Sequence, residues 1–205
     1  MLDKADYNHG SDYLVCLGDY LDRGPDSYRV VDKIKSLSSS DKVILLKGNH
    51  EVMAKEFLDV IQSRDYPIRE KDCARRYYFK YGGKETLESY NFDLDKFRED
   101  VDWLNELKVT YCSVDYIFAH AGIRPEVPYY CQSEEDMLWI RDEFIYADCD
   151  FFKEKRKIIA GHTPFAEVAF LGNRIVLDTG AGKGGKLSLM DLTSGKIYES
   201  NLTEN

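Results

Sequence analysis

Residues 13–24 read YLVCLGDYLDRG, a run of five apolar residues followed by a polar block that contains two glycines. An apolar run of this length is typical of a strand buried on both faces, and the predicted strand ends at Gly18. An amphipathic helix that reaches Leu37 is expected next. A second apolar run at residues 43–46 then ends at Gly48. Strand, helix and strand within ~35 residues predict a parallel crossover unit.

The rest of the chain alternates between helix and strand patterns. Helices are expected at residues 51–61, 84–90, 94–107 and 134–144. Residues 64–83 are polar and aromatic without a clear period, and an irregular segment is expected there. Strands are expected at residues 109–112, 116–119, 158–160, 168–170, 175–177, 187–190 and 197–198. Without a linker or an internal repeat, residues 1–205 are expected to form a single α/β domain, a sandwich of mixed β-sheet flanked by helices.

Composition narrows the class of protein. The 205 residues carry a net charge of -9, which disfavours a nucleic-acid surface because such surfaces depend on clustered Lys and Arg. No stretch approaches the ~18 consecutive apolar residues of a membrane span, and no signal peptide opens the chain. The five cysteines never form a Cys-x-x-Cys pair and fit reduced thiols. A soluble, cytoplasmic protein is expected, and nothing in the sequence indicates its oligomeric state.

Four polar blocks stand directly after apolar runs. They are Gly18–Gly24, Gly48–Glu51, His120–Gly122 and Gly161–Thr163, and they contain three of the four histidines. In open α/β sheets ligands bind beyond the carboxyl ends of the strands, so donors in these blocks are expected to converge. The expected donors are Asp19, Asn49, His120 and His162. Carboxylate, amide and imidazole without thiolate favour a divalent ion such as manganese or iron, and zinc also fits.

Each block taken singly also has a structural interpretation. Asp22 and Arg23 alone could form a surface ion pair, Asn49 could be a turn residue, and His162 could simply end a strand. The occurrence of all four blocks in one order favours a functional site over these separate interpretations.

The four blocks resemble those of the binuclear-metal phosphoprotein (serine/threonine) phosphatases, a family within the calcineurin-like metallophosphoesterases, and especially its bacterial and phage branch. Residues 161–165 (GHTPF) and 177–181 (LDTGA) extend the resemblance. It implies a metallophosphoesterase-type sandwich and two divalent metal ions. In that arrangement Asp19 bridges the ions, while Asn49, His120 and His162 complete the shell of the second one.

The resemblance also implies roles in catalysis. His50 would donate a proton to the leaving oxygen, Asp22 would fix the tautomer of His50, and Arg23 would clamp the phosphoryl oxygens. Arg141 matches the second phosphate-binding arginine of the bacterial and phage branch, although a helix with acidic neighbours could also present it to solvent. Arg124, close after His120, is a further candidate for substrate contact.

One block of the family is missing. The family's Gly-Asp-x-His-Gly block should precede the first block by some tens of residues, but only Met1–Asp12 precede the first predicted strand here. Residues 1–5 resemble the end of the family's first helix, so the chain is expected to be truncated, without the family's first strand and most of its first helix. His9 is expected on a surface loop. One of the two metal sites should then be impaired, because only Asp19 of its protein ligands remains.

Three functions follow from these observations. The first is metal-dependent hydrolysis of phosphate monoesters, phosphoserine or phosphothreonine on proteins above all, through a metal-activated water. The second is hydrolysis of diadenosine tetraphosphate, because relatives with that activity share the metal blocks; the intact Asp22-Arg23-Gly24 favours the first. The third is an inactive metal-binding or scaffold fragment, suggested by the missing block.

Two further segments have simple interpretations. Residues 75–81 (RRYYFKY) combine aromatic and basic side chains, as single-stranded nucleic-acid sites do. The acidic chain instead favours a lobe that packs its aromatic residues and presents Arg75, Arg76 or Lys80 to a phosphorylated substrate. Gly184 and Gly185 do not open a helix, so they are expected to be turn or packing glycines and not a phosphate cradle.

Overall fold

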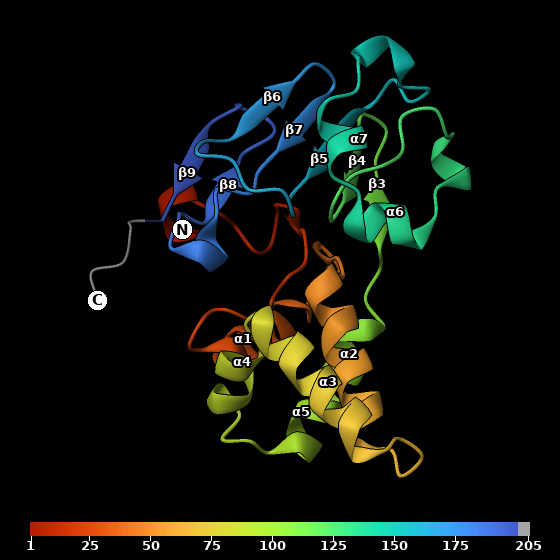
Figure 1. Ribbon diagram of the computed structural model, residues 1–205. Helices are drawn as coiled ribbons and strands as arrows, with labels where there is room; N and C mark the ends of the chain where they lie inside the picture. The colour runs from red at the N-terminus through yellow and green to blue at the C-terminus, as the bar shows by residue number, and fades with distance from the viewer. Residues whose placement is uncertain (201–205) are drawn as a thin grey trace.

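A computed structural model describes residues 1–200 of the chain. Figure 1 shows the helices α1 to α5 gathered in one part of the molecule and most strands in the other. These helices are α1 (Ser27–Leu37), α2 (Asn49–Gln62), α3 (Ile68–Lys80), α4 (Gly83–Ser89) and α5 (Leu94–Asn105). Two short helices, α6 (Glu134–Trp139) and α7 (Asp142–Ile145), lie beside the strands. No helix within residues 1–200 has the length and apolar character of a membrane span.

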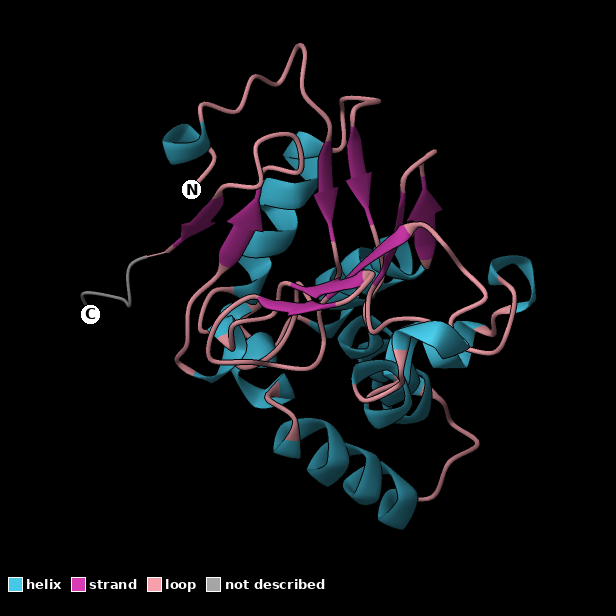
Figure 2. Ribbon diagram, turned by 90° about the horizontal axis from the view of Figure 1, so that it is seen from above, coloured by secondary structure: helices cyan, strands magenta, loops and turns pink. Residues whose placement is uncertain are grey.

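Within residues 1–200 the strands form three small sheets, whose arrangement can be followed in Figure 2. They are β1 (Leu14–Cys16), β2 (Val43–Leu45), β3 (Thr110–Cys112), β4 (Tyr116–Ala119), β5 (Lys157–Ala160), β6 (Ala169–Leu171), β7 (Arg174–Val176), β8 (Ser188–Met190) and β9 (Ile197–Glu199). β1 and β2 pair in parallel, as the crossover unit requires, and β8 pairs with β9. The central sheet has the order β3-β4-β5-β7-β6, in which the inner pairs are parallel and the outer pairs antiparallel. The predicted α/β fold with mixed sheet and flanking helices is confirmed.

Three hydrophobic clusters within residues 1–200 hold these parts together, and one of them lies around Phe144 under the central sheet. Ile44 and Leu46 of the β1–β2 unit pack with Phe118, Ile159 and Ile175 of the central sheet, which buries apolar side chains between the two sheets. The third cluster fills the helical part and includes Leu58, Phe97 and Leu104, all fully buried.

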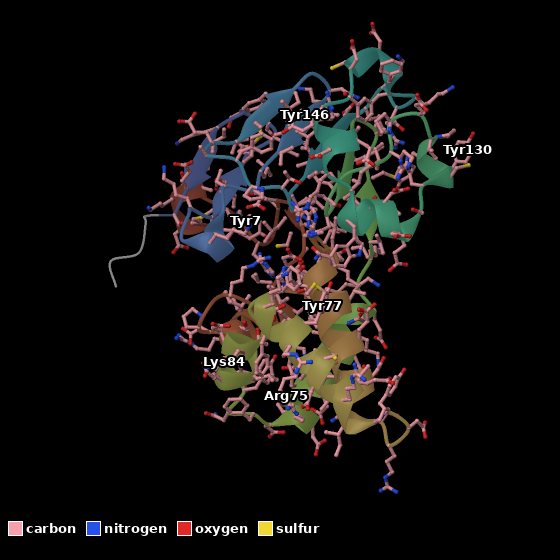
Figure 3. The ribbon with its side chains drawn as sticks, viewed as in Figure 1. Tyr7, Arg75, Tyr77, Lys84, Tyr130 and Tyr146 are labelled. Atoms are coloured by element: carbon pink, nitrogen blue, oxygen red, sulfur yellow. The ribbon has the colours of Figure 1, made fainter. Side chains whose placement is uncertain are left out.

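The sequence-based expectation for residues 64–83 is wrong, because α3 occupies most of this segment. Tyr78 is fully buried and its ring stacks on Phe57 of α2, with 4.6 Å between ring centroids. Tertiary packing therefore stabilises a helix whose own periodicity is weak. Arg75 and Tyr77 lie on the exposed side of α3 (Figure 3), and Arg75 pairs with Asp72 of the same helix.

The single helix expected at residues 134–144 is also wrong, since the backbone breaks between α6 and α7. Ile140 and Arg141 leave the helical region, with φ/ψ of -57°/141° and -132°/-90°. The break lets Phe144 and Ile145 enter the core under the central sheet. It also turns the Arg141 guanidinium toward the carbonyl of His162, to which Nη1 donates a hydrogen bond at 3.0 Å.

Candidate metal centre

The predicted donors all follow strands of the parallel pairs. Asp19 follows β1, Asn49 follows β2 as the first residue of α2, His120 follows β4 directly, and His162 follows β5. These strands present their carboxyl ends to the region where the sheets meet the helices, and Figure 3 shows side-chain nitrogen atoms gathered there. The parallel arrangement thus brings together donors more than 140 residues apart, from 19 to 162.

The tautomer of His120 follows from its hydrogen bond to the backbone. Nδ1 lies 2.7 Å from the carbonyl oxygen of Leu17, which can only accept, so Nδ1 carries the proton. Nε2 therefore presents a lone pair. It lies 3.0 Å from Oδ1 of Asn49, 3.1 Å from Nδ1 of His162 and 3.4 Å from Oδ1 of Asp19.

This cluster suits a cation. The amide oxygen of Asn49 and the carboxylate of Asp19 are acceptors, as is Nε2 of His120. These acceptor atoms face one another, with Nδ1 of His162 beside them, and a cation between them would satisfy their lone pairs. The ligand atoms of Asp19, His120 and His162 all lie within 4.8 Å of one another. Burial, together with the neighbouring His120 and Arg141, lowers the pKa of His162 to about 3, which keeps its imidazole in the neutral form that binds metals. The donor set of carboxylate, amide and imidazole fits a divalent ion.

Glu51 organises the loops that carry these donors, and sequence reasoning missed it. Its fully buried carboxylate accepts the N–H groups of Gly48 at 2.7 Å, Asp19 at 2.9 Å and Tyr20 at 2.8 Å. Burial and the charge of Asp19 raise its pKa to about 7. The available signal was the position of Glu51, three residues after Gly48 at the start of α2, which is capping-box spacing. Glu51 thus ties the first and second blocks to each other.

A second polar cluster adjoins the donors. Nδ1 of His50 lies 2.6 Å from the carboxylate of Asp22, and Nε2 lies 2.7 Å from Nη2 of Arg23. Burial alone would lower the pKa of His50, but the Asp22 hydrogen bond and the charge of Asp19 raise it above the ordinary value. The other oxygen of Asp22 accepts hydrogen bonds from Tyr78 and Thr86 at 2.8 Å each. Sequence reasoning found neither Tyr78 nor Thr86, because no local pattern marks them.

An open crevice connects the two clusters. Its lining includes Asp19, His50, His162 and three cationic residues, Arg23, Arg141 and Lys183. The structure therefore brings Arg141 to the site but leaves Arg124 out. Arg124 Nη2 pairs with the Asp136 carboxylate at 2.5 Å and lines a neighbouring groove beside α6, which shares Arg141 with the crevice. His9 is exposed, as expected, and is not part of the donor cluster found within residues 1–200.

The mixed sheets, the strand-end donors and the crevice lined by cationic residues suit a metal-dependent α/β protein that binds an anionic ligand. The family model for calcineurin-like phosphoesterases matches residues 1–184, and the chain belongs to this family. Members of the family depend on divalent metal ions, and the cluster of Asp19, His120 and His162 fits that requirement.

Relatives with two different activities resemble the chain equally well. The asymmetrical bis(5'-nucleosyl)-tetraphosphatase PrpE of Anoxybacillus flavithermus is 27% identical, with 86% of this chain and 74% of that one aligned. Serine/threonine-protein phosphatase 2 of Escherichia coli is 26% identical over 86% of this chain and 78% of its own. The crystal structure of a candidate diadenosine tetraphosphatase shares the fold, with a TM-score of 0.66 and 20% identity over 97% of this chain and 84% of that one.

Proposed function

We propose that this phosphoesterase holds its metal ion with Asp19, Asn49, His120 and His162, and that it hydrolyses phosphoester substrates in the adjoining crevice. The observation that carries the proposal is the convergence of their lone pairs beside the His50–Asp22 pair. A bound divalent ion would polarise the phosphoryl group and lower the pKa of a water molecule. Manganese is the proposed metal, and iron and zinc also suit this donor set.

His50 is the proposed proton donor to the leaving oxygen, positioned by Asp22. In the structure, Arg23 donates to Nε2 of His50, because a guanidinium has no acceptor. Binding of a phosphoryl group by Arg23 would free Nε2 to take up a proton from solvent, which the raised pKa of His50 favours, and to donate it to the leaving oxygen. Arg23 and His50 are thus arranged so that substrate binding prepares the proton donor.

Phosphoserine or phosphothreonine on proteins is the first candidate substrate. The serine/threonine phosphatase relatives and the intact Asp22-Arg23-Gly24 support it. Diadenosine tetraphosphate is the second candidate, supported by the PrpE relative and by three cationic residues in the crevice. All five cysteines are free, which supports the cytoplasm as the compartment.

The described residues favour one tight metal site. Within residues 1–200, clustered His, Cys, Asp and Glu donors form a single group around Asp19. We therefore expect native mass spectrometry of the chain to show one manganese ion bound far more tightly than a second.

The metal assignment is tested by comparing His162→Ala with His9→Ala. His162→Ala should weaken manganese binding about 100-fold or more and abolish turnover, because it removes a buried ligand. His9→Ala, an exposed histidine outside the cluster, should match the wild type in both. Calorimetry with manganese measures the first effect, and phosphate release from a phosphopeptide and from diadenosine tetraphosphate measures the second. Tight metal binding without turnover of either substrate would point instead to the scaffold alternative.

A further inference from the structure

A glycine-rich turn, residues 180–185 with the sequence GAGKGG, forms one wall of the crevice. The carboxylate of Asp178 accepts the N–H of Gly180 at 2.8 Å, and the N–H of Lys186 donates to the carbonyl of Thr179 at 3.1 Å. Gly180 and Gly184 both have left-handed φ angles, 80° and 82°, which let the chain reverse. These hydrogen bonds fix the base of the turn.

The tip of the turn lies against Arg23. A Cβ atom at Gly182 would stand 3.3 Å from Cδ of Arg23 and 3.4 Å from its Nη1. The backbone of the turn therefore approaches the arginine that is proposed to bind the phosphoryl group. Lys183 is the next residue and lines the same crevice.

Lys183 differs from the other two cationic residues of the crevice in the hydrogen bonding of its side chain. Arg23 is bonded to His50, and Arg141 is bonded to the carbonyl of His162. Lys183 is exposed, and within the described part of the chain its ammonium group has no ion-pair or hydrogen-bond partner. Its charge is available to a ligand that enters the crevice.

We propose that Lys183 binds a second phosphate group next to the one that is hydrolysed, and that it favours polyphosphate substrates over simple phosphate monoesters. An ammonium acts as a point charge on a flexible stem, so it suits a neighbouring phosphate whose position varies, whereas the arginine fork suits the phosphoryl group held in one geometry. The inference rests on the proposed phosphoester hydrolysis and, of its two candidate substrates, favours diadenosine tetraphosphate over phosphoproteins.

The test compares kcat/KM for diadenosine tetraphosphate and for p-nitrophenyl phosphate, each with manganese. Lys183→Met should lower the value for diadenosine tetraphosphate about tenfold, the loss expected for one charge-assisted contact, and leave the value for p-nitrophenyl phosphate within about twofold. Lys183→Arg should retain most of the preference. Lys155→Met removes another exposed lysine, located in the loop before β5, and should change neither value.

Binding of inorganic pyrophosphate and orthophosphate, measured by calorimetry, provides a readout independent of turnover. Lys183→Met should weaken pyrophosphate binding about tenfold more than orthophosphate binding. Equal losses on both substrates, or no loss on either, would overturn the inference. A phosphopeptide with acidic neighbours is assayed alongside, and a loss confined to it would also overturn the inference, by assigning Lys183 to a peptide. If the wild type turns over none of these substrates, the proposed function fails, and the pyrophosphate measurement still decides the place of Lys183.

Discussion

Four residues of the two polar clusters have left-handed backbone conformations. They are Asp19, Asp22, Arg23 and His162, with φ angles of 58°, 73°, 66° and 63°. Such a conformation costs a residue other than glycine about 1–2 kcal/mol, so other contacts must hold it. The backbone N–H groups of the first three donate to Glu51, Thr86 and the carbonyl of Gly82, respectively. Distant segments therefore offset the strain of the backbone that places these side chains in the two clusters.

Arg23→Lys should lower kcat/KM without changing the affinity for manganese. Lysine keeps the charge but loses the two-pronged contact with phosphoryl oxygens, so kcat/KM should fall about 10- to 100-fold. Manganese affinity should stay within about twofold, because Arg23 is not one of the donors. Steady-state kinetics and calorimetry measure the two quantities. Arg124→Lys is the matched control, since Arg124 pairs with Asp136 outside the crevice, and it should behave like the wild type.

Among the helices and strands, α3 and α4, with the turn of residues 81–82 between them, contact Asp22 and Arg23 directly. Tyr78 at the end of α3 and Thr86 in α4 both donate to Asp22, while Gly82 between them accepts the N–H of Arg23 at 3.0 Å. Thus α3, which covers the helical core, also supports the orientation of His50 through Asp22.

Gly82→Ala should disrupt the packing of the turn between α3 and α4 against Arg23. Gly82 has a φ of 99°, and an added Cβ would clash with the backbone nitrogen of Arg23. We expect a loss of about 2–3 kcal/mol in the free energy of unfolding, and lower turnover because Arg23 is displaced. Urea unfolding checks the stability. Gly24→Ala is the control, because its Cβ meets nothing within 4 Å and its φ is not left-handed; a loss as large for Gly24 would contradict the argument.

For the whole molecule, a buried carboxylate with two partly exposed lysine partners, away from the crevice, ties the helical part together. The carboxylate of Asp100 in α5 accepts from Nζ of Lys35 in α1 at 2.5 Å, from the hydroxyl of Tyr90 at 2.9 Å and from Nζ of Lys96 at 3.2 Å. Burial alone would raise the pKa of Asp100, but these hydrogen bonds outweigh it and hold the pKa below the ordinary value. Asp100 therefore stabilises the fold in its ionised form.

Asp100→Asn should consequently reduce stability in a pH-dependent way. At pH 7 we expect a loss of about 2 kcal/mol, limited by the partial exposure of both lysines. Because the folded-state pKa is depressed, the stabilisation is complete above the unfolded-state pKa of about 4 and disappears as pH falls through the folded-state pKa. Urea midpoints of the wild type and the variant should thus converge below about pH 4. A difference that stays constant from pH 7 to pH 3 would show that the charge of Asp100 is not the cause.

The sequence by itself determined the α/β class and the positions of the strand-end donors. Short apolar runs followed by Gly-Asp, Gly-Asn or a histidine are local patterns, and the parallel pairing of β1 with β2 and of β4 with β5 then places Asp19, Asn49, His120 and His162 at one edge. Periodicity also sufficed for α1, α2 and α5, since each has one clearly apolar face.

Only the tertiary structure decided the rest. The helical state of α3 depends on stacking of Tyr78 against Phe57, and the break at Arg141 depends on burial of Phe144. The contacts of Asp22 with Tyr78 and Thr86 span 56 and 64 residues, so no local pattern reveals them. The sequence offers both Arg124 and Arg141 as candidates for substrate contact. In the structure Arg124 pairs with the nearby Asp136, whereas Arg141 lines the crevice. Local patterns place a residue on its element, but the partners of its side chain depend on how distant elements pack.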